Sequence, residues 1–155
     1  MLSQPTTEQV ILDCRKELLS TINDALTDAP ARIAVQMMEN VLRNCAERAS
    51  HEIAWMREET DVMIAFAERV VASPASTPQV EGALAAYRAG RSDSLHLDDV
   101  SATYSLAGEC LSTGLEAALA AGDDTLQMAG REALELRLAH EQQIMGEWVM
   151  VGRAE

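Results

Sequence analysis

Residues 31–72 contain neither glycine nor proline and make up almost all of the longest such stretch in this chain. They read ARIAVQMMENVLRNCAERASHEIAWMREETDVMIAFAERVVA. Apolar residues recur along the stretch at spacings typical of one helix face. This stripe comprises Met38, Leu42, Cys45, Ala49, Ile53, Met56, Met63, Ala67 and Val70. One helix of this length would be about 60 Å long, several times the usual length. We predict one long helix here rather than a break near residues 57–61.

Start and stop signals predict four further helices around the long one. Thr6 and Gln9 have the spacing of a capping box and should open the first helix. The segment SPASTP at residues 73–78 is a linker, and Pro78 suits the first position of the next helix. The five expected helices cover residues 7–26, 31–72, 78–89, 98–121 and 124–151.

Glycines and aspartates predict the remaining helix ends. Gly90 and Gly122 follow apolar helical segments and are expected to adopt the left-handed conformation that closes a helix. Asp98 should cap the fourth helix, and Asp123 or Asp124 the fifth, because a carboxylate can accept from free backbone amides there.

The sequence predicts an all-α fold. No segment alternates polar and apolar residues as a strand would, and Ala, Leu and Met are abundant while aromatic residues make up only 3%. Gly108 and Gly114 lie inside a predicted helix, where they should let a neighbouring backbone approach. We therefore expect one domain, residues 1–155, built as a helical bundle of about five helices with one long helix and no sheet.

Charge and cysteine content limit the classes of partner. A formal net charge of −13 repels phosphate backbones and anionic lipids, so we expect neither nucleic-acid nor membrane binding. The chain has no apolar signal core and no membrane-spanning stretch. Cys14, Cys45 and Cys110 are far apart and should be free, buried thiols of a reducing compartment. These features predict a cytoplasmic protein.

One pattern, R-x-x-H-E-x-x-x-M-x-E, occurs twice, on two different predicted helices. We call these two segments the first cassette and the second cassette. The first consists of Arg48, His51, Glu52, Met56 and Glu58, and the second of Arg137, His140, Glu141, Met145 and Glu147. Trp55 and Trp148 lie near the two cassettes and are candidate anchors of a buried interface.

Three interpretations of the cassettes compete. In the first, the charged residues are solvated helix faces, with Arg48–Glu52 and Arg137–Glu141 as weak ion pairs one turn apart. In the second, the cassettes meet within a subunit or across a dimer axis. Arg48 would then pair with Glu141, and Arg137 with Glu52, which would fix register and partner choice.

The third interpretation is a metal centre. Di-iron bundles take Glu and His from facing helices through Glu-x-x-His pairs, and the candidate ligands here are His51, His140, Glu109 and Glu116, with Glu52 and Glu141 beside the histidines. The residue three positions before each histidine is an arginine, however, where that family needs a carboxylate. We therefore predict no metal and no cofactor.

The N-terminal third resembles a known group of proteins. The residues that carry the resemblance are Thr6-Thr7-Glu8-Gln9-Val10-Ile11-Leu12, Leu18-Leu19, Arg32 and Met37-Met38-Glu39-Asn40-Val41-Leu42. They are similar to small uncharacterised helical bacterial proteins encoded beside acyl-CoA dehydrogenases and aminoglycoside-phosphotransferase-like kinases. The resemblance covers roughly the first 45 residues. It implies an accessory role, with a protein partner from acyl-CoA or small-molecule kinase metabolism.

No nucleophile elbow, P-loop or dinucleotide fingerprint is present. We therefore expect a non-enzymatic accessory or interaction protein that acts as a helical scaffold. A long helix in so small a chain lacks partners for its whole length, so a homodimer is expected. The interface residues would be Arg48, His51, Glu52, Trp55, Arg137, His140, Glu141 and Trp148. The alternative is a ligand- or metal-binding bundle enzyme with His and Glu around a polar pocket.

Overall fold

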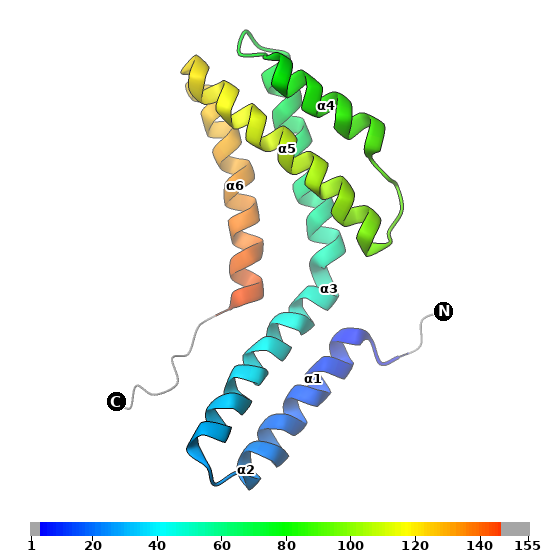
Figure 1. Ribbon diagram of the computed structural model, residues 1–155, viewed down its shortest axis with the longest axis vertical. Helices are drawn as coiled ribbons and strands as arrows, with labels where there is room; N and C mark the ends of the chain where they lie inside the picture. Colours follow the sequence, from blue (N-terminus) through cyan, green and yellow to red (C-terminus); the bar gives the residue numbers. More distant parts are fainter. Residues whose placement is uncertain (1–3, 147–155) are drawn as a thin grey trace. The chain divides into compact units, whose positions relative to one another are not determined.

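The computed structural model describes residues 4–146, and these are helical almost throughout (Figure 1). The helices are α1 (Thr7–Glu17), α2 (Asn23–Ala25), α3 (Ala29–Val71), α4 (Pro78–Gly90), α5 (Leu97–Ala121) and α6 (Asp124–Met145). A π-helical turn, η1 (Leu18–Ile22), joins α1 to α2 into one continuous segment. The predicted all-α fold of five helical segments is confirmed, and residues 4–146 contain no strand.

The long helix is also confirmed, because α3 runs unbroken from Ala29 to Val71. Its start is stabilised by Asp28, whose carboxylate accepts from the Ala31 amide at 3.0 Å. Among residues 4–146, none of the helices combines the length and the hydropathy that crossing a lipid bilayer requires.

The structure divides into two compact units. Unit 1 consists of Met1–Glu52 and Glu141–Glu155, of which residues 4–52 and 141–146 are described, and unit 2 consists of Ile53–His140. The expected single domain over residues 1–155 stays a prediction.

In unit 1, α1 and the first part of α3 form a helical hairpin (Figure 1). The predicted capping box is present, since Thr6 and Gln9 exchange hydrogen bonds between side chain and backbone. Arg15 of α1 donates to Glu39 of α3 at 2.5 Å, which links the two helices of the hairpin. Few apolar side chains of this hairpin are buried.

In unit 2, α3, α4, α5 and α6 surround a core of buried apolar side chains. The core includes Met63, Phe66, Val70, Val80, Leu84, Tyr87, Ala107, Cys110, Leu111, Ala118 and Leu126. The apolar stripe predicted on α3 is therefore buried from Met63 onward, whereas Met38 and Cys45 of the same stripe are exposed.

Several helix ends lie where the sequence predicts them, and two do not. Gly122 closes α5 with φ 64°, and Asp123 accepts from the amides at the start of α6. Gly90, however, is the last residue of α4, which ends in an extended conformation at Arg91 instead of a left-handed glycine. The fourth helix begins at Leu97 rather than after an Asp98 cap.

Two further expectations were wrong. α6 ends at Met145 rather than near residue 151, because Gly146 adopts a left-handed conformation with φ 57°. Cys14 and Cys45 are exposed, since both lie on the thinly covered hairpin. Cys110 is buried, and this burial raises the pKa of its thiol.

The two glycines inside α5 have different surroundings. A Cβ added at Gly114 would lie 2.9 Å from Cε1 of Phe66, so the absent side chain makes room for an aromatic ring rather than for a backbone. A Cβ at Gly108 would meet nothing within 4 Å, which contradicts the close approach expected there.

Alanine at these two glycines should therefore have opposite effects on stability. Gly114→Ala is expected to lower the free energy of unfolding by about 1–3 kcal/mol through overpacking against Phe66. Gly108→Ala should raise it by up to about 1 kcal/mol, because alanine favours the helix. Urea unfolding followed by circular dichroism measures both, and the same sign of change in both variants would contradict this account.

Candidate functional site

A buried carboxylate lies among the helices of unit 2. Glu59 is on α3 and is only 7% exposed; it and Thr60 are the buried polar or charged residues recorded in the described chain. Burying an ionised carboxylate is costly unless hydrogen bonds and opposite charges compensate it. The neighbours of Glu59 therefore define the candidate site.

Tyr104 of α5 supplies the first of these compensating groups. Its hydroxyl donates to Glu59 Oε2 at 2.5 Å. Burial, and secondarily the hydrogen bond to Glu59, raises the pKa of the Tyr104 phenol from its ordinary value near 10 to about 12. The phenol therefore stays protonated across the physiological range and acts as a donor.

His140 of α6 supplies the second group. Its Nδ1 lies 2.7 Å from Glu59 Oε1 and must carry the proton if the carboxylate is ionised, because that oxygen can then only accept. Its ring stacks on Trp55 of α3, with centroids 4.7 Å apart and planes 11° apart. Its Nε2 lies 3.7 Å from Oε2 of the exposed Glu58. The His140 side chain is 12% exposed and is held on three sides.

Arg137, one helical turn before His140, completes the site. Its Nε is 3.6 Å from Glu59 Oε2, and its guanidinium carbon lies 5.8 Å from the centre of the Tyr104 ring. The first distance is that of an ion pair without a hydrogen bond, and the second allows a cation–π interaction. We call Trp55, Glu58, Glu59, Tyr104, Arg137 and His140 the Glu59 network.

The Glu59 network joins three helices of unit 2 through directional contacts. Glu59 comes from α3, Tyr104 from α5, and Arg137 and His140 from α6. Both ring nitrogens of His140 face carboxylates, and proton transfer to a substrate would have to compete with these contacts. The arrangement therefore favours a structural role in fixing the register of the helices, which buried polar groups perform in some proteins.

Tyr104→Phe tests the hydrogen bond at the centre of this network. The variant should lose about 1–3 kcal/mol of stability at pH 7, because Glu59 Oε2 loses the hydroxyl that donates to it. Between pH 10 and 12 the wild type should lose further stability, since the phenol ionises more readily in the unfolded chain than in the folded one. The variant lacks the part of this loss that Tyr104 causes and keeps the part that the buried Tyr87 causes. Urea unfolding at pH 7 and pH 11 measures it, and equal alkaline losses in both proteins would refute the assignment.

The first cassette is arranged differently from the second. Arg48 Nη1 lies 3.4 Å from Oε1 of Glu52 one turn along the same helix, as the solvated-face interpretation expects. His51 Nδ1 is 3.1 Å from the Glu47 carbonyl oxygen and 3.5 Å from its carboxylate. Trp55, beside this cassette, belongs to the Glu59 network.

The second cassette contributes Arg137 and His140 to the Glu59 network, whereas Glu141 is exposed. Trp148, proposed from the sequence as an interface anchor, and Glu147 lie outside the described residues. Each arginine thus has a partner other than the reciprocal one: Arg48 is beside Glu52, and Arg137 is beside Glu59. Reciprocal pairing between two copies of the chain stays a prediction.

The residues considered as metal ligands are not gathered into a site. Glu109 and Glu116 are exposed on α5, and His140 is in contact with Glu58 and Glu59 instead. Across residues 4–146, no group of three or more His, Cys, Asp and Glu side chains is arranged to hold a metal ion.

Sequence reasoning missed Glu59 and Tyr104. The available signal was the position of Glu59 on the apolar stripe of α3, three residues after Met56 and four before Met63. A carboxylate on the buried face of a helix indicates a compensating partner.

No known protein family, curated protein or solved structure matches this chain. Functional inference therefore depends on its own residues.

Proposed function

We propose that this protein is a non-enzymatic interaction protein that pairs with a second copy of itself. The pairing surface is the N-terminal hairpin, residues 7–52, which comprises α1, η1, α2 and the first part of α3. The paired hairpins then present a helical scaffold to a protein partner. The observation that carries the proposal is the exposed apolar surface of this hairpin.

The hairpin has very little core of its own. In the described part of unit 1, the buried apolar side chains are Leu18, Val35 and Ala46. Helices gain most of their stability from packing an apolar face against another element, and isolated helices are marginal in water. Three buried side chains are few for the number of residues that must be ordered here. A further surface that covers the hairpin would supply the missing burial.

The hairpin carries large exposed apolar side chains that a second surface can bury. The exposed ones on the hairpin are Val10, Leu12, Leu19, Ile22, Ile33, Met37, Met38 and Val41. Ile33, Met37 and Val41 follow one another at intervals of four residues, so they lie along neighbouring turns of α3. A contiguous apolar surface of this kind typically marks an interaction site.

A second copy is the occupant that suits this surface best. Two hairpins related by a two-fold axis would bring together four helical segments, an arrangement that buries apolar faces on all of them. Self-association of a chain with charge −13 must rely on apolar rather than acidic surface. The protein partner that then binds the paired hairpins comes from acyl-CoA or small-molecule kinase metabolism, as the N-terminal resemblance implies.

Sedimentation equilibrium of the purified chain tests the proposal. The expected mass is that of two 16.8 kDa chains at micromolar concentration. A mass of 16.8 kDa throughout, with full helicity, would rule the pairing out.

A further inference from the structure

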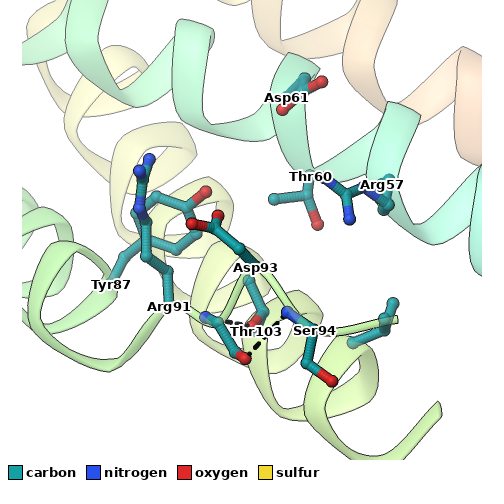
Figure 2. A pocket seen from close by; sticks show the side chains of 10 residues that line it. Arg57, Thr60, Asp61, Tyr87, Arg91, Asp93, Ser94 and Thr103 are labelled. Carbon is teal, nitrogen blue, oxygen red and sulfur yellow. Dashed lines mark hydrogen bonds between the residues drawn. The ribbon is translucent and has the colours of Figure 1, made fainter. Parts of the chain in front are cut away.

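A polar cavity of about 100 Å³ lies in unit 2, and its lining contains no residue of the Glu59 network (Figure 2). It is formed by α3, the end of α4, the loop that follows and the beginning of α5. Its lining is Arg57, Thr60, Asp61, Tyr87, Arg91, Ser92, Asp93, Ser94, Val100 and Thr103. None of them is one of the five repeated residues of either cassette, although Arg57 lies between Met56 and Glu58 of the first.

Hydrogen bonds order the loop that forms one wall of this cavity. The Ser92 amide donates to Thr103 Oγ1 at 3.1 Å, and the Ser94 amide donates to Ser92 Oγ at 3.2 Å (Figure 2). The Thr103 hydroxyl in turn donates to the Asp99 carbonyl oxygen at 2.9 Å. The loop therefore holds Arg91 and Asp93 against the cavity without help from a ligand.

Four charged residues line the cavity, and all four are exposed. They are Arg57 and Asp61 from α3, and Arg91 and Asp93 from the loop. None of the four takes part in an ion pair within 4.0 Å among residues 4–146. Their formal charges sum to zero, although the whole chain carries −13. The cavity thus offers separate sites for a negative and a positive group.

Two hydroxyl-bearing residues in the lining add to these charges. Thr60 is 6% exposed and lines the cavity, and its hydroxyl makes no hydrogen bond to another described residue. Figure 2 places Thr60 beside Arg57, with Asp93 on the facing loop. Tyr87 is also buried, and this burial raises the pKa of its phenol, so the hydroxyl stays neutral; it has a side-chain hydrogen bond with Arg91. The Thr60 hydroxyl is therefore available to a ligand that enters the cavity.

We infer that this cavity binds a small zwitterionic metabolite of the amino-acid class. The ligand carboxylate lies against Arg57 and the Thr60 hydroxyl, and the ligand ammonium lies against Asp93. A simple carboxylate would leave the aspartates unpaired, and it would be repelled by the acidic protein. A simple amine would leave the arginines unpaired. Only a ligand with both charges satisfies both sides of the cavity.

Titration of the ¹⁵N-labelled full chain with glycine, L-alanine and L-serine tests the inference by NMR. We expect saturable shifts of the amide signals of Ser92, Ser94 and Thr103 for at least one of these amino acids. Acetate and methylammonium should bind at least about tenfold more weakly, since each lacks one of the two charges. Absence of shifts with all three amino acids, or equal binding of acetate, would overturn the inference.

Variants locate the binding groups. Thr60→Val keeps the volume of the side chain and removes only its polar atom, so it should weaken binding about tenfold while the protein remains as stable as the wild type or becomes more so. Asp93→Asn should weaken binding at least as much. Asp99→Asn is the matched control, because Asp99 is exposed and does not line the cavity. Unchanged binding in both Thr60→Val and Asp93→Asn would overturn the assignment.

Discussion

His140→Phe should lower the free energy of unfolding by about 3–5 kcal/mol. Phenylalanine can keep the stacking on Trp55, but it removes the donor that lies 2.7 Å from Glu59 Oε1. Glu59 would then remain buried with only Tyr104 and the more distant Arg137 to compensate it. Urea unfolding followed by the fluorescence of Trp55, in a Trp148→Phe background, measures the change.

A double-mutant cycle separates the charge effect from lost packing. Glu59→Leu removes the buried carboxylate, so His140→Phe should cost much less in that background than in the wild type. The matched control is His96→Phe, at an exposed loop histidine, with an expected change within about 0.5 kcal/mol. If the costs of Glu59→Leu and His140→Phe simply add, the two side chains are not coupled and the Glu59 network is not a unit.

The double substitution Met37→Glu with Val41→Glu should weaken self-association of the chain at least about a hundredfold, which corresponds to about 3 kcal/mol. Both residues are exposed on the hairpin, and pairing would bury two new carboxylates per chain without partners. Sedimentation velocity over a dilution series gives the dissociation constant of the wild type and of the variant.

Met128→Glu is the matched control for this substitution. Met128 is 64% exposed on α6 of unit 2, close to the 65% of Met37, but it does not belong to the hairpin. The control should associate as the wild type does. If the hairpin variant and the control have the same dissociation constant as the wild type, the hairpin is not the pairing surface.

The helical fold could be predicted from the sequence because its signals are local. The long glycine- and proline-free stretch, the Thr6 capping box, Pro78 and Gly122 all act within one or two helical turns. Two helix ends were misplaced for a physical reason. Gly90 and Asp98 are good terminal residues, but the loop between them is held by the hydrogen bonds of Ser92 and Thr103, which moves the true ends.

The candidate site could be predicted only in part. The repeated pattern indicates Arg137 and His140, and Trp55 is a candidate because tryptophan is enriched at buried interfaces. Glu59 and Tyr104 are 45 residues apart, and the contact between them depends on how α3 and α5 pack. Spacing along one helix carries no information on that packing. For the same reason, two cassettes that share the same five-residue pattern have different partners in the folded chain.

Hydrogen–deuterium exchange at two protein concentrations tests most directly whether the hairpin depends on a second copy. Well above the dissociation constant, amides of residues 7–52 should be protected. On dilution below it, their protection should fall, while amides of α4 and α5 stay protected by the core of unit 2. If protection of the hairpin does not change with concentration in a chain that sediments as a monomer, the hairpin is stable alone and the proposed pairing is wrong.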